Sequence, residues 1–361
     1  MSARRLRAGL IGYGYAGKTF HAPLIAAVPA LELAAVASSD AAKVHADWPG
    51  VPVFASPAEL IARADIDLVV IATPNDTHHS LARDALRAGR HVVVDKPFTV
   101  ALADARELVA LARERGKLLS VFHNRRWDGD LLTLKRLLGE GVLGRVVEMD
   151  SRIDRWRPEV RQRWRESTGP GAGLWFDLGP HLVDQALQLF GPPHAIALER
   201  ALVREGALAD DWFHASLRYD RLHVHLRASM LAAASAPRFT LHGTRGSFVK
   251  HGPDPQEDAL KAGVRPTWPP QAAWGVDTGR AAIVTRADDG AVVEAPVALE
   301  RGAHQAYFAA VAAAIRGEAP NPVPPEEALA VMELIELGIR SAAERRELEW
   351  RIGPSPARSR R

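Results

Sequence analysis

Asp177 and His181 are the residues whose types and spacing best suit the transfer of a proton, and Lys96 is a cation whose position favours a ligand contact. Lys96 lies in Asp95-Lys96-Pro97, directly after an apolar run that is typical of a buried strand. Asp177 and His181 are four residues apart, so on a helix their side chains share a face. A carboxylate beside an imidazole orients the ring and raises its basicity, which suits a general base near neutral pH.

Each of these residues also has a simpler interpretation. Lys96 can be a cation on a surface loop, and an acid–histidine pair can be a surface contact or two of several metal ligands. Gly179-Pro180 lies between the pair and can kink or restart the helix, which weakens the argument from spacing. Because no further His, Asp or Glu has the spacing of a ligand set, we expect no metal site.

A glycine-rich motif, Gly12-Tyr13-Gly14-Tyr15-Ala16-Gly17, follows a predicted strand and opens a predicted helix. In this setting Gly12 permits a tight turn, Gly14 lets the backbone approach a pyrophosphate, and Gly17 lets the helix pack on the strand. The pyrophosphate then lies at the helix N-terminus, where free N–H groups favour anions. We therefore assign Gly12, Gly14, Tyr15 and Gly17 to cofactor binding; the alternative is a plain glycine-rich turn.

The end of the second predicted strand indicates which dinucleotide binds. NAD enzymes usually place an acid there to bind the ribose hydroxyls, whereas this chain has Ser38-Ser39 and then Lys43. Ser38 and Ser39 can donate hydrogen bonds to a 2′-phosphate, and Lys43 can pair with its charge. These residues favour NADP over NAD. Asp40 is evidence for NAD instead, because it becomes the ribose-binding acid if the end of the second strand is placed slightly later in the chain.

Two further segments follow predicted buried strands at the edge of the sheet where ligands bind in this architecture. The first is Ala72-Thr73-Pro74-Asn75-Asp76-Thr77-His78, and the second is Asp95-Lys96-Pro97. We expect additional cofactor contacts from residues of both segments. These are Thr73, Pro74, Asn75, His78, Lys96 and Pro97.

The elements that position these residues form two groups along the chain. Short, nearly continuous apolar runs at 6–11, 31–37, 68–72, 91–94 and 118–122 alternate with helical patterns, which predicts βαβ units and a parallel sheet. After residue 124 the strands alternate between polar and apolar residues, which predicts an antiparallel sheet with one exposed face. Segments 252–270 and 320–325 are rich in proline and are expected to be loops, and a final helix is expected at about 326–345.

The predicted fold class is α/β, with two domains in 361 residues. We expect residues 1–123 to form an N-terminal Rossmann dinucleotide-binding domain, and residues 124–361 to form an α+β domain that has a large, mainly antiparallel open sheet and binds the substrate. No stretch is long and apolar enough to span a membrane. The formal net charge is only +3 and both signs are mixed along the chain, so we expect no nucleic-acid partner. The chain has no cysteine, which excludes thiol chemistry and fits a reducing compartment, so we expect a cytoplasmic protein.

Together and in this order, the motifs resemble the Gfo/Idh/MocA family of NAD(P)-dependent oxidoreductases. The matching segments are the glycine motif at 12–17, then 72–78, 95–97 and 171–181, and the resemblance covers essentially the whole chain. Within the family, the first part of the chain is similar to the branch that holds NADP-dependent scyllo-inositol dehydrogenases. Asp95 replaces the glutamate that is usual in the family, which keeps the charge with a shorter reach.

The resemblance implies a reaction on CH–OH groups of a polyol, a sugar or a related carbonyl compound. His181 is then the general base for the substrate hydroxyl, Lys96 bonds that hydroxyl and the nicotinamide ribose, and Asp177 orients the site. The hydride passes between the substrate carbon and the nicotinamide. The resemblance also implies a homodimer or higher homo-oligomer that forms through the open sheet.

Arg125, Arg126 and Asp154, together with His181, are candidates for contacts to the substrate. For the first three, surface or interdomain salt bridges are an equally good interpretation. Two other functions remain open: an NAD-dependent glycosidase that oxidises its substrate transiently, and a non-catalytic sensor of sugars or dinucleotides. The presence of Lys96, Asp177 and His181 argues against the sensor.

Overall fold

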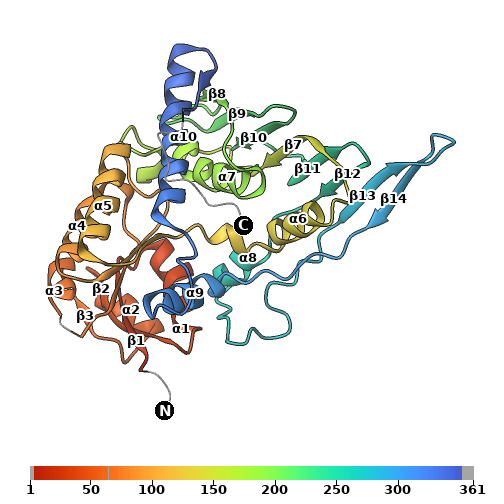
Figure 1. Ribbon diagram of the computed structural model, residues 1–361. Helices are drawn as coiled ribbons and strands as arrows, with labels where there is room; N and C mark the ends of the chain where they lie inside the picture. The colour runs from red at the N-terminus through yellow and green to blue at the C-terminus, as the bar shows by residue number, and fades with distance from the viewer. Residues whose placement is uncertain (1–3, 64, 352–361) are drawn as a thin grey trace.

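The N-terminal part of the chain forms a parallel sheet in the computed structural model, which describes residues 4–63 and 65–351 (Figure 1). Within these residues the sheet has the six strands β1 (Leu6–Ile11), β2 (Leu31–Ala37), β3 (Val53–Phe54), β4 (Leu68–Ile71), β5 (His91–Val94) and β6 (Leu119–Val121). They lie in the order β3-β2-β1-β4-β5-β6, and each neighbouring pair is parallel. In this doubly wound order, ligands bind where the strand order reverses, beside β1 and β4.

Helices alternate with these strands, as the sequence predicts. They are α1 (Ala22–Ala26), α2 (Ala41–Asp47), α3 (Pro57–Ala62), α4 (His78–Arg87) and α5 (Leu102–Arg115). The Oγ atom of Ser56 accepts a hydrogen bond from the Glu59 N–H and so caps α3, which begins at Pro57. Helix α5 ends at Gly116, whose φ of +60° is a left-handed conformation that glycine adopts without strain. The parallel α/β fold is therefore confirmed.

The C-terminal part forms a second, larger sheet. Among the described residues its nine strands are β7 (Val146–Arg152), β8 (Ala195–Ala201), β9 (Trp212–Arg218), β10 (His223–Ser229), β11 (Phe239–Gly243), β12 (Gly246–Lys250), β13 (Ala281–Arg286), β14 (Val292–Pro296) and β15 (Leu348–Glu349). The order is β14-β13-β12-β11-β7-β10-β9-β8-β15. Neighbours are antiparallel, except that β7 and β10 are parallel. This confirms a mainly antiparallel sheet.

One face of the second sheet is apolar and is covered by helices α7 (Leu174–Phe190) and α10 (Pro325–Glu344) (Figure 1). In β10, Val224 and Leu226 are fully buried on this face, while His225 and Arg227 point to the other face and are half-buried. The alternation that the sequence predicts for this strand is thus confirmed. The remaining helices are α6 (Gly129–Gly139), α8 (Gln256–Lys261) and α9 (Gln305–Ile315).

Two details of local structure in this part differ from what the sequence suggested. Helix α7 runs through Pro180 without a restart. The neighbouring Gly179 allows close helix packing, because a Cβ atom there would lie 2.8 Å from the Trp175 ring and 3.0 Å from Ile335 of α10. The segment 252–270, which we expected to be a loop, contains the short helix α8.

Helix α9 lies beside α1 and packs on the core of the first sheet, although it comes late in the chain (Figure 1). Its Tyr307 and Phe308 rings lie 5.1 and 5.6 Å from the ring of Phe122 at the end of β6. The first core therefore contains residues from beyond position 124, and a domain boundary at 123/124 stays a prediction. Over residues 4–63 and 65–351, no helix has the length and hydropathy that a membrane span requires.

Candidate active site

A cleft of about 600 Å³ lies between the carboxyl edge of the parallel sheet and the C-terminal part of the chain. From the first sheet, Lys96 follows β5 and Phe122 follows β6, and both line the cleft. Asp177 and His181, on the first turns of α7, line it from the other side. The three residues expected to be catalytic are thus brought to one cleft, and its size suits a small-molecule ligand.

An ion pair joins Lys96 to Asp177 across the cleft. The Nζ atom of Lys96 donates hydrogen bonds to Oδ1 of Asp177 at 3.0 Å and to the Asp177 carbonyl oxygen at 2.7 Å. Arg155 and Arg165 each approach the same carboxylate to 3.5 Å. Burial alone raises the pKa of Asp177, but the charges of Lys96, Arg155 and Arg165 outweigh it and hold the pKa well below its usual range. Asp177 is therefore a fixed negative charge that anchors Lys96.

His181 is buried on α7, with 6% of its surface exposed, and its Nδ1 atom has no hydrogen-bond partner among the described residues. The hydrogen bonds of the Asp177 side chain go to Lys96 and Arg155, so our expectation that Asp177 orients the imidazole is replaced by its pairing with Lys96. Burial, and then the positive charges of Lys96 and Arg125, hold the pKa of His181 well below its usual 6.5. The ring is thus neutral at pH 7 and able to accept a proton.

Asp95 precedes Lys96 in the chain and contacts both its backbone and His21. Its Oδ1 atom accepts a hydrogen bond from the Lys96 N–H, and Oδ2 lies 3.7 Å from Nε2 of the fully buried His21. Burial raises the pKa of Asp95, but His21, Lys96 and His78 outweigh it and lower the pKa to about 2. Asp95 therefore adds a second fixed negative charge at the base of the lysine.

The glycine motif has the shape of a dinucleotide-binding turn. Gly12 has a φ of +95°, and a Cβ atom there would lie 2.6 Å from the Ala72 carbonyl oxygen. A Cβ atom at Gly17 would lie 2.0 Å from the Gly12 carbonyl oxygen, so the turn and the helix that follows it touch directly. Gly14, in contrast, faces open space with nothing within 4 Å. This bare backbone lies close to the N-terminus of the helical segment Gly17–His21, which continues into α1, and it fits the pyrophosphate of NAD(P).

Gly14→Val is expected to raise the Kd for NADP by at least about tenfold, or about 1.4 kcal/mol, because the side chain fills the space in front of the turn. The melting temperature should not change, because Gly14 has no positive φ and no neighbour for valine to displace. Fluorescence titration with NADPH measures the Kd. Gly50→Val is the matched control, since Gly50 also faces open space but lies in a turn after α2. Equal affinity in both variants would contradict a pyrophosphate at Gly14.

The residues expected to choose between NADP and NAD lie together at the end of β2. Ser38 is half-buried, while Ser39 and Lys43 are exposed. Asp40 caps α2, because its Oδ1 atom accepts a hydrogen bond from the Lys43 N–H at 2.9 Å. Because Asp40 caps α2, the presence of an acid at this position does not require that it bind the ribose of the cofactor.

Two of the expected cofactor residues, His78 and Asn75, make hydrogen bonds within the protein that join loops at the edge of the sheet. His78 is fully buried, and its ring nitrogens contact the carbonyl oxygens of Pro97 at 2.8 Å and Thr73 at 3.1 Å. Asn75 is also buried and donates a hydrogen bond to the Gly171 carbonyl oxygen at 3.1 Å. These contacts join the loops after β4 and β5 to the loop before α7. His78 and Asn75 thus position the cleft wall.

The three candidates for substrate contacts have different surroundings. Arg125 lines the cleft and pairs with Asp128 at 3.2 Å and with Glu257. Asp154 lies 3.1 Å from Arg152 and lines an adjoining hollow of about 320 Å³.

Arg126 lies outside the lining of the cleft. It is 6% exposed and pairs with the buried Asp184 at 2.5 Å and with Glu327 at 2.6 Å. The structure therefore places Arg126 in the interior, which corrects our expectation that it contacts the substrate.

Comparison with known proteins agrees with these features. Residues 6–123 match the NAD-binding Rossmann-fold domain of the Gfo/Idh/MocA oxidoreductase family, and residues 135–350 match its C-terminal alpha/beta domain. The chain belongs to this family. It is an NAD(P)-dependent dehydrogenase or reductase, as the family and its sugar dehydrogenases indicate.

Individual relatives cover nearly the whole chain. The uncharacterized oxidoreductase YdgJ of Escherichia coli is 56% identical over 95% of this chain and 98% of its own length. The scyllo-inositol 2-dehydrogenase (NADP(+)) IolW of Bacillus subtilis is 36% identical over 95% of both chains. The solved structure of YPO2259 from Yersinia pestis has a TM-score of 0.93 and 54% identity, covering 98% of this chain and 99% of that one.

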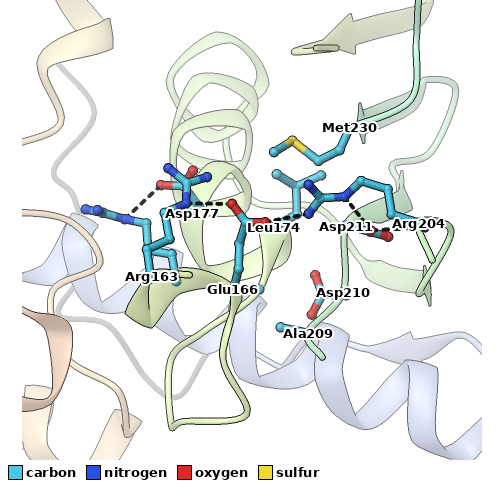
Figure 2. A pocket seen from close by; sticks show the side chains of 11 residues that line it. Arg163, Glu166, Leu174, Asp177, Arg204, Ala209, Asp210, Asp211 and Met230 are labelled. Carbon is cyan, nitrogen blue, oxygen red and sulfur yellow. Dashed lines mark hydrogen bonds and ion pairs between the residues drawn. The ribbon is translucent and has the colours of Figure 1, made fainter. Parts of the chain in front are cut away.

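This Gfo/Idh/MocA protein has one group of cleft residues that our reading of the sequence did not assign to the site. Arg155, Arg157, Arg161, Arg163 and Arg165 all line the cleft. The signal is visible as a run of arginines between positions 152 and 165, but acidic residues are mixed into this run, and we used the mixed charges only to argue against a nucleic-acid partner. Figure 2 shows the base of this segment, where Glu166 lies between Arg163 and Arg204.

Proposed function

We propose that this protein transfers a hydride between NADP and a CH–OH group of a polyol or sugar, or the corresponding carbonyl. The observation that carries the proposal is the position of Lys96, Asp177 and His181 in one cleft beside the glycine turn. The scyllo-inositol 2-dehydrogenase among the relatives supports a polyhydroxy substrate. When bound, the nicotinamide supplies the hydride chemistry.

Three side chains of this protein take part in the reaction of the substrate hydroxyl: one accepts its proton, one stabilises the charge on its oxygen, and one holds the second in place. His181 is neutral at pH 7 and takes the proton of the substrate hydroxyl during oxidation. Lys96 donates a hydrogen bond to the same oxygen and stabilises the negative charge that develops there. Asp177 holds Lys96 in place through the contact at 3.0 Å. In the reverse direction, protonated His181 returns its proton to the new hydroxyl.

Turnover of candidate substrates tests this function directly. A panel of inositols and aldoses is incubated with NADP and with NAD, small carbonyl compounds are incubated with NADPH and with NADH, and the change in nicotinamide absorbance is compared with the amount of product. We expect one mole of reduced cofactor for each mole of oxidised product. Cleavage of a glycoside without a net change in absorbance would instead indicate a glycosidase that oxidises its substrate transiently.

The preference for NADP gives a further prediction. Lys43 is exposed at the end of β2, so Lys43→Ala should lower kcat/KM with NADP by about tenfold, the effect of one lost charge-assisted hydrogen bond. The same constant with NAD serves as the internal control and should stay unchanged. A clear preference of the unaltered enzyme for NAD, or an equal loss with both cofactors, contradicts this assignment.

A further inference from the structure

The active-site cleft carries much more positive than negative charge. Five arginines of the segment 155–165, which we call the arginine segment, line it together with Lys96. The acidic residues that line the same cleft are Asp95, Asp177 and Glu257. A neutral polyol has no group that needs such a field, whereas an anion is strongly attracted by it.

Most of these cations already have partners. Asp177 is shared by Lys96, Arg155 and Arg165, and Glu166 accepts a hydrogen bond from Arg163 at 2.6 Å. Arg157 and Arg161 are different, because in the part of the chain that the structure describes neither has an acidic side chain as an ion-pair partner.

Arg157 is also surrounded by like charges. Burial, and then the neighbouring positive charges of Arg155, Arg161 and Arg163, lower the pKa of its guanidinium. An anion placed among these arginines reduces their mutual repulsion. Arg157 and Arg161 are therefore the residues of the cleft that are best able to bind a negative group.

Buried ion pairs hold the arginine segment in shape (Figure 2). Arg204, whose side chain is 2% exposed, pairs with Glu166 at 2.9 Å and with Asp211 at 2.8 Å. Its Nη1 atom donates hydrogen bonds to the carbonyl oxygens of Arg157 at 3.2 Å and Glu159 at 3.0 Å. The backbone that carries Arg157 is thus fixed before a ligand arrives, which lowers the entropy cost of binding.

We propose that the substrate carries an anionic group, a carboxylate or a phosphate, which Arg157 and Arg161 bind while its hydroxyl lies at Lys96 and His181. This inference rests on the proposed function and names the substrate class of the same site. Guanidinium groups form paired hydrogen bonds with both kinds of anion. The pyrophosphate of the cofactor has its own site at Gly14, so it leaves these two arginines free.

Binding of matched compounds tests the proposal. Glucose is compared with glucuronate and with glucose phosphate, and myo-inositol with its monophosphate, by calorimetry on the NADP-bound enzyme. We expect the anionic member of at least one pair to bind at least about tenfold more tightly, as one charge-assisted hydrogen bond provides. Comparison of the affinities for glucuronate and for the phosphorylated compounds shows which anion is preferred. The advantage should shrink at high salt, because ions screen the field.

The double variant Arg157→Gln/Arg161→Gln should lose about 10- to 100-fold in affinity for the anionic member and leave the neutral member unchanged. The double lysine variant keeps the charges and should keep part of the preference. Arg87→Gln, at an exposed position of α4, is the control for net charge. Melting temperatures report whether each variant folds.

Four results would overturn the proposal, and three of them concern the anionic compounds: no binding by any anionic compound, equal binding within every pair, or an unchanged preference in the double glutamine variant. A loss of NADP affinity in that variant would overturn it as well, by assigning the arginines to the cofactor. Anion-dependent binding without any nicotinamide turnover would contradict the proposed function alone, so the two failures are distinguishable.

Discussion

Lys96→Ala is expected to lower kcat at least about 100-fold and to leave the protein folded, because it removes the charge that stabilises the substrate oxygen. Asp177 keeps Arg155 and Arg165 at 3.5 Å, so its carboxylate does not become an unpaired buried charge when the lysine is lost. KM should change much less than kcat, since the interaction is strongest in the transition state.

Steady-state rates with the best substrate of the panel, together with circular dichroism and the melting temperature, test this prediction. Lys117→Ala is the matched control, because Lys117 follows α5 and lies outside the lining of the cleft. A Lys96→Ala enzyme that folds and keeps near-normal kcat would remove Lys96 from the mechanism.

His181→Asn is expected to lower the rate of substrate oxidation at least about 100-fold, because it removes the group that accepts the hydroxyl proton. The pH dependence separates this role from a structural one. The pKa of His181 lies well below 6.5, so in the unaltered enzyme this group is already neutral at pH 7. Its protonation should lower kcat/KM for oxidation only in the more acidic range, and this acid limb should disappear in His181→Asn.

The profile of kcat/KM against pH for both enzymes provides the measurement. His79→Asn is the control, since His79 pairs with Glu107 on the outer helices and lies outside the cleft lining. An acid limb that persists unchanged in His181→Asn assigns the titration to another group. A limb centred above pH 7 contradicts the low pKa on which the assignment depends.

Elements whose causes are local were predictable from the sequence. The cap of α3 depends on Ser56, Pro57 and Glu59, which are adjacent in the chain, and the alternation in β10 follows from the period of a strand. The glycine motif is local in the same sense, because its steric demands arise within one turn and the helix that follows. The short strand β3 was missed, since two residues show no periodicity.

Partners that come from distant parts of the chain were not predictable in this way. The spacing of Asp177 and His181 showed only that they share a helix face, and the partner of Asp177 proved to be Lys96, 81 residues earlier. Arg126 resembled a substrate contact until the fold paired it with Asp184 and Glu327. Spacing along the chain contains no information about which charge a side chain meets across a cleft.

The sequence by itself determined the parallel sheet and the dinucleotide turn, and it singled out the three residues that we propose carry the chemistry. These follow from periodicity, from glycine sterics and from residue types at strand ends, which act over a few residues. Only the tertiary structure decided which cations are neutralised by partners and which are left for a ligand. The reason is that the net charge and the burial of a site depend on every helix, strand and loop that packs around it, including those that are distant in the sequence. We therefore propose the run of arginines at 152–165 as part of a binding site only because, among the described residues, Glu166 and Asp177 leave Arg157 and Arg161 without an acidic partner.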